Sequence, residues 1–320
     1  MDEPTAVVDK SLFELICLQK DVPPDCYFGH LGSRYQLIVP PILVEEIIVN
    51  LVEPQGRAPA VVDEMVTQVL KLRPNWMEDI IEMAFKELVL KQSLEKFPAP
   101  ADAHIKKLEQ LLRLGKNDPE LLNWVHRRPA EKKDTITQRK EGQDKLIPPG
   151  TRLRLSSELS FFHHTVQKEL LPKLCNAAER TEMLEIILGE RFRKIHPDFS
   201  NEVAGQFQSL DADKIKNYPI TLKCLLTRLI YVLAPCIEIY SPGAGTEPRE
   251  ILDRKSKNQR NNLEDEEYVA SALLCGRLLT ADRGMKNIAQ VFRAGGFWMG
   301  EVIWIDPRQA LADQIPLLLV

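Results

Sequence analysis

The sequence predicts an α/β protein with a parallel sheet, interrupted by a long helical insertion. Short apolar runs rich in β-branched residues lie near both ends of the 320-residue chain, each next to a segment with helical periodicity. A proline or an acidic residue lies within two positions after each run. Strands and helices that alternate in this way form parallel sheets covered by helices, whereas the middle of the chain reads as helical.

Composition places the chain among globular proteins with a large core. Apolar residues make up 44% of it and charged residues 28%. No apolar run approaches the roughly 18 residues of a membrane span, and residues 1–10 lack the pattern of a secretion signal. The six cysteines stand singly, without the pairs typical of zinc sites or disulfide frameworks. We therefore expect a cytoplasmic protein with reduced core cysteines and no membrane contact.

The N-terminal region carries two strands that end at polar or breaking residues. Residues 6–8 form the first run, which ends at Asp9, and residues 11–16 read as a helix. Helix capping is the ordinary explanation for an Asp in this place. Residues 37–39 form a second strand before two prolines, and residues 42–52 return to a helix that carries Glu45 and Glu46. Two acids in an otherwise apolar turn are unusual.

Helical patterns then dominate as far as a short strand at residues 236–240. The stretch at 128–149 is charged and poor in apolar residues, which is typical of a linker. The expected helices cover residues 61–72, 76–94, 105–114, 119–125, 157–195, 201–210 and 221–233.

A helix at about residues 263–276 and a buried strand at 278–280 form the unit around which the chain is organised. Asp265 lies on the same helical face as the apolar residues Tyr268 and Ala272, whereas its acidic neighbours point to the flanks. A negative charge at a helix N-terminus explains this position as well as a functional role does. Asp282 follows the strand, however, and open α/β sheets keep their sites at the carboxyl ends of strands. Two inward carboxylates at one edge suggest a metal.

The last predicted strand covers residues 301–305. Asp306 follows it, and we expect this residue to cap a helix at 308–312. The six histidines show no ligand spacing, so we expect them to pack or to lie on the surface.

Net charge gives little sign of nucleic-acid binding, but local charge does. The formal net charge is −4, whereas residues 127–154 hold nine Lys or Arg against four Asp or Glu, and residues 249–260 hold five against two. A solvated loop is the other explanation for both basic segments. The second segment ends five residues before Asp265.

Four acidic motifs, in order, resemble those of the PIN-domain nuclease family. They are Asp9 in Val-Val-Asp-Lys-Ser, Glu46 in Val-Pro-Pro-Ile-Leu-Val-Glu-Glu-Ile, Asp265 with Ala272 seven residues on, and Asp282 in Leu-Leu-Thr-Ala-Asp-Arg-Gly-Met. A glutamate followed directly by Ile or Leu favours Glu46 over Glu45. The resemblance implies a three-layer α/β/α domain formed by residues 1–96 and 221–320. Because Glu46 and Asp265 are 219 positions apart, residues 97–220 are expected to be a helical insertion outside the family pattern.

The resemblance further implies a metal-dependent nuclease that cuts RNA in preference to DNA. Asp9, Glu46, Asp265 and Asp282 are then catalytic residues and ligands for Mg²⁺ or Mn²⁺, which prefer oxygen donors. Ser11 and Thr280 are expected to hydrogen-bond these ligands. In the basic segment, we expect Arg254, Lys255, Lys257 and Arg260 to bind the nucleic-acid backbone.

The alternative is a PIN-like scaffold that has lost activity and recruits a partner through its helical insertion. The insertion could also mediate contact with a protein partner or with a second copy of the chain. Four neighbouring acids without a metal repel one another, so a scaffold has little physical reason to keep them.

Overall fold

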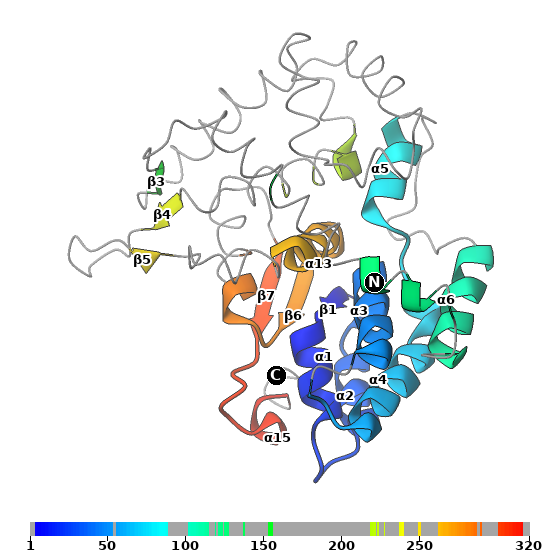
Figure 1. Ribbon diagram of the computed structural model, residues 1–320. Helices are drawn as coiled ribbons and strands as arrows, with labels where there is room; N and C mark the ends of the chain where they lie inside the picture. The colour runs from blue at the N-terminus through cyan, green and yellow to red at the C-terminus, as the bar shows by residue number, and fades with distance from the viewer. Residues whose placement is uncertain are drawn as a thin grey trace.

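The main sheet has four parallel strands and joins the two ends of the chain. The computed structural model describes residues 4–53, 56–88, 102–114, 262–286 and 300–315, together with shorter pieces between 119 and 289. The strands lie in the order β2-β1-β6-β7 (Figure 1). They are β1 (Thr5–Val8), β2 (Gln36–Ile38), β6 (Arg277–Thr280) and β7 (Glu301–Trp304). The predicted α/β class with a parallel sheet is therefore confirmed.

Pairing between β1 and β6 places distant residues side by side. Val7 and Val8 of β1 are in register with Leu278 and Leu279 of β6. At the start of β1, Thr5 Oγ1 donates a hydrogen bond of 2.8 Å to the carbonyl of Cys275, 270 residues away. Because the two strands run parallel, their carboxyl ends, and whatever follows them, lie at one edge of the sheet.

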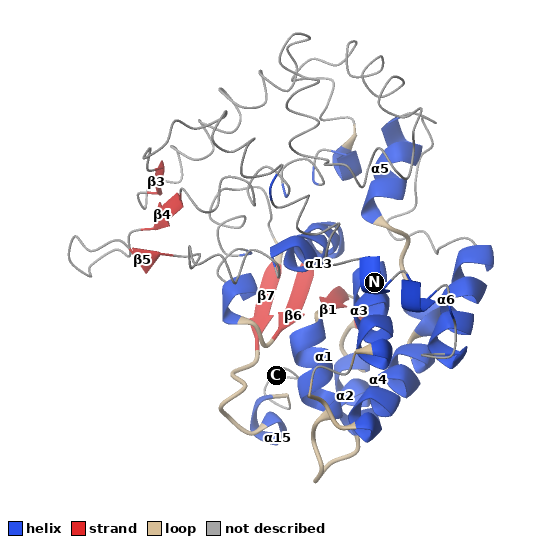
Figure 2. Cartoon of the chain, viewed as in Figure 1, coloured by secondary structure: helices blue, strands red, loops and turns tan. Residues whose placement is uncertain are grey.

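Both faces of the sheet are covered where β1 crosses its centre. All four residues of β1 are buried. Since successive side chains of a strand point to opposite faces, this burial requires covering structure on both sides. Figure 2 shows the helices gathered around the strands. Among the contacts that hold them, α13 (Asn262–Cys275) packs against β1, and α1 (Lys10–Cys17) packs against β6.

The N-terminal helices follow the predicted pattern except for α2 (Pro24–Gly32), which was not predicted, and for the start of α5 (Ile80–Leu88). The others, in chain order, are α3 (Pro41–Val52), α4 (Pro59–Lys71), the 3₁₀ turn η1 (Arg73–Asn75) and α6 (Asp102–Leu114). The expected helix start at residue 76 is wrong, because α5 begins at Ile80. Trp76 instead forms a parallel bridge with Val39, and its ring nitrogen donates to the Val69 carbonyl at 3.1 Å.

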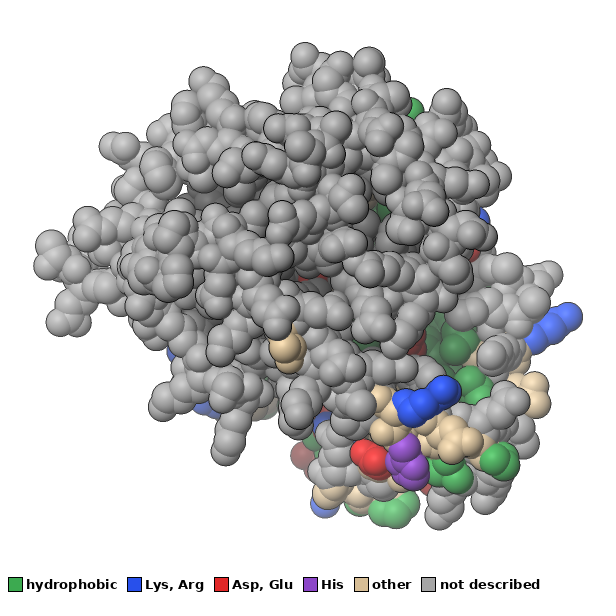
Figure 3. Space-filling model, turned by 45° about the horizontal axis from the view of Figure 1, so that its top comes forward, with side chains coloured by type: hydrophobic (Ala, Val, Ile, Leu, Met, Phe, Trp, Pro, Cys, Tyr) green, Lys and Arg blue, Asp and Glu red, His purple; other side chains and the backbone are tan. Residues whose placement is uncertain are grey.

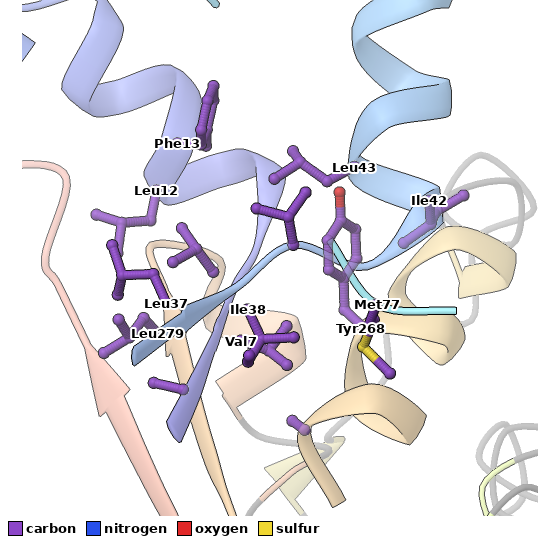
Figure 4. Close-up of a cluster of buried hydrophobic side chains, with 14 of the residues drawn as sticks. Val7, Leu12, Phe13, Leu37, Ile38, Ile42, Leu43, Met77, Tyr268 and Leu279 are labelled. Atoms are coloured by element: carbon purple, nitrogen blue, oxygen red, sulfur yellow. The ribbon is translucent and has the colours of Figure 1, made fainter. Parts of the chain in front are cut away.

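Aliphatic and aromatic side chains from both ends of the chain fill one core. Figure 4 shows Leu12 and Phe13 of α1 on one side of the strands and Tyr268 of α13 beside Met77 on the other. The Phe13 and Phe28 rings lie 5.0 Å apart, in a tilted arrangement that suits aromatic pairs. Packing of this kind fixes α1 and α13, two of the helices that carry predicted site residues, relative to the sheet.

Helix α13 is buried on nearly all sides rather than along one stripe. Every residue from Tyr268 to Cys275 is buried, as expected of a helix covered by neighbours all round. Glu266 was expected on a flank, but it is only 1% exposed, so that expectation is wrong. Asp265 is half-buried. Contacts of α13 with α3 and α5, in addition to the sheet, account for the burial.

The start of the expected insertion packs on the N-terminal part. Helix α6 contacts α3, and its residues Ile105, Leu108 and Leu112 belong to the main core. A second, smaller sheet consists of β3 (Leu153–Leu155), β4 (Ile237–Ile239) and β5 (Arg249–Glu250). The expected strand at 236–240 is thus β4. The predicted linker at 128–149 and the helices at 157–195 and 201–210 fall almost entirely outside the described residues, and the domain boundaries stay a prediction.

The chain after β7 folds into a turn before its last described helix. Asp306 does not cap a helix at 308–312 as expected, because α15 (Leu311–Gln314) begins later. The Asp306 carboxylate accepts instead from the backbone and guanidinium of Arg308, and the Gln314 side chain bonds both backbone groups of Asp306. These contacts satisfy the polar groups that a helix would otherwise pair.

Among the described cysteines, the expectation of buried, unpaired side chains is met at two of three positions. On the face shown in Figure 3, the coloured side chains of different kinds are interspersed. Within the described residues, no helix has the length and apolarity needed to cross a membrane. Cys17 and Cys275 are free and buried, but Cys26 is exposed, so the expectation of core cysteines is wrong at that position.

Glu87 generates the first prediction because it ties α5 to the C-terminal half. Its buried carboxylate accepts hydrogen bonds from the backbone of Ile220 and Thr221 and from the Thr221 hydroxyl, at 2.8–3.1 Å. Glu87→Ala leaves buried backbone donors without an acceptor and should lower the free energy of unfolding by about 1–3 kcal/mol. Denaturant unfolding followed by circular dichroism measures the loss.

The matched controls separate the loss of the hydrogen-bond acceptor at Glu87 from the loss of its charge. Glu87→Gln keeps a carbonyl acceptor and should lose less than Glu87→Ala. Glu109→Ala removes a carboxylate whose partner, Arg73, is 45% exposed, and it should cost no more than about 1 kcal/mol. Equal losses of unfolding free energy for Glu87→Ala and Glu109→Ala would contradict the role of Glu87 as a buried acceptor.

Candidate acidic site

Asp9 caps helix α1 and lies buried at the end of β1. Its Oδ1 accepts from the backbone nitrogen of Leu12 at 2.9 Å, which is the bond of a helix N-cap. The hydroxyl of Ser11 lies 2.9 and 2.7 Å from the two carboxylate oxygens, and the hydroxyl of Thr280 donates to Oδ2 at 2.6 Å. Asp9 therefore both caps α1 and contacts the predicted residues Ser11 and Thr280.

Thr280 connects Asp9 with Asp282 across the strand ends. Its hydroxyl, which donates to Asp9, accepts from the backbone nitrogen of Asp282 at 2.9 Å. The Asp282 carboxylate in turn accepts from the backbone of Met285 at 2.9 Å, one turn along the following helix. A Cβ placed on Gly284 would come within 3.0 Å of that carboxylate. The glycine thus leaves room for Asp282, which is exposed, whereas Asp9 lies in the interior.

Glu46 reaches the same region from helix α3. Its Oε1 pairs with Lys10 Nζ at 2.9 Å, and its Oε2 accepts from the Tyr268 hydroxyl at 2.7 Å. Figure 4 shows the Tyr268 hydroxyl directed toward α3. Glu46, as the sequence favoured, faces the other acids, and these contacts join α1, α3 and α13.

Asp265 lies close enough to the other three acids for their charges to act on it, and it has no hydrogen-bond donor of its own within the described part of the chain. Burial raises its pKa well above the usual value, and the neighbouring charges of Asp282, Glu46 and Asp9 raise it further, whereas Lys10 lowers it. The structure therefore brings the four acids into one electrostatically coupled group, which we call the acid cluster: Asp9, Glu46, Asp265 and Asp282.

Burial also dominates the electrostatics of Asp9 and Tyr268. Desolvation raises the pKa of Asp9 to about 7, against the lowering effect of hydrogen bonds from Thr280, Leu12 and Ser11. Burial likewise raises the pKa of the Tyr268 phenol well above 10, with the Glu46 charge next in size. Tyr268 therefore stays a neutral donor to Glu46 at ordinary pH.

The donor chemistry of the acid cluster fits a hard divalent cation. It offers only oxygen atoms, and a half-buried carboxylate without a donor, such as Asp265, is suited to a cation. The described residues contain no group of three or more His, Cys, Asp or Glu side chains already spaced to hold a metal ion. Hydrogen bonds account in part for the separation of the carboxylates, because α1 and β6 hold Asp9, whereas Lys10 and Tyr268 hold Glu46.

Sequence reasoning missed Lys10 and Tyr268 as partners of Glu46. Lys10 follows the buried Asp9 directly, and its ammonium pairs with Glu46. Two signals were available. A lysine in the first turn of a helix opposes the helix dipole, and so calls for an acidic partner. Tyr268 lies three residues after Asp265, on the same face of its helix.

The predicted phosphate-binding residues Arg254, Lys255, Lys257 and Arg260 lie outside the described residues. The structure instead describes other basic residues that follow β6 and β7. Arg283 is exposed, Lys286 lies 4.0 Å from the centre of the Trp304 ring, and the Arg308 side chain is 78% exposed. Arg308 and, to a smaller extent, Arg283 lower the pKa of Asp306. A short basic rim formed by these three residues thus follows the carboxyl ends of β6 and β7.

The raised pKa of Asp9 gives a pH dependence with a defined sign. Between the ordinary value of 3.8 and about 7, the folded protein holds the Asp9 proton more tightly than the unfolded chain does. In metal-free buffer, this group therefore makes stability fall as pH rises through that window, by up to about 1.4 kcal/mol per pH unit. Asp9→Asn should flatten this dependence, as measured by thermal unfolding from pH 4.5 to 7.5.

Asp25→Asn is the control, because Asp25 pairs with Lys71 at the surface and its pKa is lowered. That variant should keep the parent's fall in stability. A parent slope that survives Asp9→Asn unchanged would show that Asp9 does not titrate in this window.

Comparison with known proteins identifies no relative of the chain. No protein-family model matches the chain, and no curated protein or solved structure matches it.

Proposed function

We propose that the protein is a Mg²⁺- or Mn²⁺-dependent endoribonuclease with a PIN-like, three-layer α/β/α domain and an inserted helical region. The observation that carries the proposal is that Asp9 and Asp282 follow adjacent parallel strands and are joined through Thr280. The charges of Glu46 and Asp265, from two further helices, act on the same group. Like charges brought together destabilise the fold unless a cation offsets them. The proposal assigns the four motif residues to one site near the carboxyl ends of β1 and β6.

Bound divalent ions would activate water for attack on phosphorus and stabilise the leaving oxygen. The chain's own residues prepare the site for such ions. Ser11, Thr280 and the α1 backbone fix the buried Asp9 carboxylate. Asp265 offers oxygens without a donor, Asp282 offers them at the surface, and Tyr268 orients Glu46. Asp9, Asp265 and Asp282, together with Glu46, would hold the ions.

RNA is the proposed substrate, in preference to DNA, and the charge around the acid cluster supports a phosphate-bearing polymer. Arg283 and Lys286 follow the exposed Asp282 in the chain, and Arg308 is an exposed cation after the end of β7. A backbone phosphate bound near Asp282 would be attracted by these charges. The basic segment that includes Arg254 and Arg260 precedes α13 in the chain and would extend this contact. Contacts of this kind place the scissile phosphate without reading sequence.

A second function, that of an inactive scaffold, is favoured by one contact. Lys10 pairs with Glu46 at 2.9 Å, which gives the acid cluster a cation from the chain itself. A scaffold of this kind would recruit its protein partner, or a second copy of the chain, through residues 97–220. It predicts no dependence of stability on divalent metal.

The metal proposal predicts that Mn²⁺ raises the melting temperature of the parent protein. Saturation at 100 times the dissociation constant would add about 2.7 kcal/mol, a rise of several degrees. Asp265→Asn should remove most of the rise, because it takes a charge from the centre of the acid cluster. Differential scanning fluorimetry with Mn²⁺, Mg²⁺ and EDTA measures the effect.

Asp25→Asn serves as a control that removes an acid distant from the acid cluster. A parent melting temperature indifferent to Mn²⁺ and Mg²⁺ would favour the scaffold. Hydrolysis of labelled single-stranded RNA, run beside the matching DNA, then tests the reaction. Cleavage that persists in Asp265→Asn at the parent's rate would point to a contaminating nuclease.

The substrate proposal predicts salt-sensitive RNA binding through the basic segment. Changing Arg254, Lys255, Lys257 and Arg260 together to Ala should weaken binding at low salt and leave the Mn²⁺ shift intact. The slope of log affinity against log salt should fall by roughly one unit for each basic residue that no longer binds a phosphate. The paired variant Arg283→Ala/Arg308→Ala tests the basic rim by the same titration. A parent-like slope in both variants would remove both surfaces from the substrate path.

A further inference from the structure

Lys10 occupies one side of the acid cluster with a positive charge of the chain's own. It is the first residue of α1, directly after Asp9, and its Nζ lies 2.9 Å from Glu46 Oε1. The Lys10 side chain is 20% exposed and that of Glu46 is 13% exposed. The pair is therefore shielded from solvent more than most surface ion pairs, where screening leaves little net interaction.

Both carboxylate oxygens of Glu46 already have a donor. Lys10 takes Oε1, and the neutral Tyr268 hydroxyl takes Oε2 at 2.7 Å. A divalent cation that binds Glu46 can coexist with the neutral phenol, whereas a neighbouring ammonium repels it. The four-carbon stem of lysine is flexible, so the ammonium can leave while α1 stays in place.

The influence of Lys10 extends beyond Glu46. It is the cation that opposes the three acidic neighbours of Asp265. The remaining described ion pairs of the N-terminal helices, such as Arg57 with Glu14 and Lys71 with Asp25, involve acids outside the acid cluster. The charge of Glu46 also acts on Arg57, but the direct partner of Arg57 is Glu14. Lys10 is thus placed to neutralise the acid cluster when no metal is bound.

We infer that Lys10 is a tethered counter-ion that competes with the divalent cation for Glu46 and so sets the metal concentration at which the site fills. This inference rests on the proposed metal-dependent function and adds regulation of that site. At low metal, Lys10 offsets part of the negative charge and the site stays empty. At high metal, the ion displaces the ammonium from Glu46, and Tyr268 keeps the carboxylate oriented.

The test is a Mn²⁺ titration of the full chain, followed by calorimetry and by thermal shift. Lys10→Met keeps most of the side-chain length without the charge and should lower the Mn²⁺ concentration at half-saturation by roughly tenfold, since a unit charge at close range acts strongly at the effective dielectric of a protein. Lys10→Arg keeps the charge and adds a second carboxylate contact, so its half-saturation concentration should equal or exceed the parent's.

A second readout distinguishes competition from a purely structural role. Competition predicts that Lys10→Met melts below the parent in EDTA but matches or exceeds it at saturating Mn²⁺. A structural role predicts an equal loss under both conditions. Lys10→Gln, which remains polar, provides the same comparison if Lys10→Met does not yield folded protein.

Lys71→Met controls for the removal of a lysine from an ion pair, because Lys71 pairs with Asp25 at an exposed site. Its half-saturation concentration should match the parent's. If the parent binds Mn²⁺ and Asp265→Asn abolishes binding, but Lys10→Met keeps the parent's half-saturation concentration, the competition is refuted and the metal site stands. If the parent itself shows no Mn²⁺ binding in either measurement, the proposed function fails and the competition fails with it.

Discussion

The carboxylate of Asp9 lies where the two central strands end side by side, and most of the acid cluster is arranged around it. Three donors hold it: the backbone of Leu12, the hydroxyl of Ser11 and the hydroxyl of Thr280. Thr280 comes from the far end of the sequence, so one carboxylate links the N-terminal helix to the C-terminal strand. Its burial disfavours the charged form, and this raises its pKa despite the donors.

Local signals allowed much of the main sheet to be predicted. Strands β1, β2, β6 and β7 are short apolar runs that end at polar or breaking residues, and these features are visible in sequence. The errors have two causes. Trp76 pairs with Val39, 37 positions away, instead of starting a helix, and a local helical pattern does not encode such a contact. At Asp306 the competing contacts are local, because Arg308 and Gln314 satisfy its polar groups in a turn rather than in a helix.

The acid cluster was partly visible for a different reason. Asp9 and Asp282 could be expected at one edge, because parallel strands share the direction in which they end. Helical phase indicated that Asp265 faces inward, but it could not show that Glu266 is buried as well, since that depends on neighbours packed around α13. The positions of Lys10 and Tyr268 hinted that each has a role near the acids. That their shared partner is Glu46 depends on how separate helices are placed, because a single sequence does not record a pairing across 222 positions, as between Glu46 and Tyr268.

Three of the four carboxylates in the acid cluster have contacts that stabilise the fold, whereas the described residues give Asp265 none. Each carboxylate except Asp265 has a structural contact: Asp9 caps α1, Asp282 accepts from the next helix, and Glu46 joins α1 to α13 through Lys10 and Tyr268. These contacts hold three negative charges in place without help from a ligand. Asp265 has no such contact within the described residues, and its charge is opposed chiefly by burial and by the other acids. Under the proposed function, Asp265 is therefore the carboxylate that would gain most from a bound cation, and this position should govern whether the acid cluster binds metal.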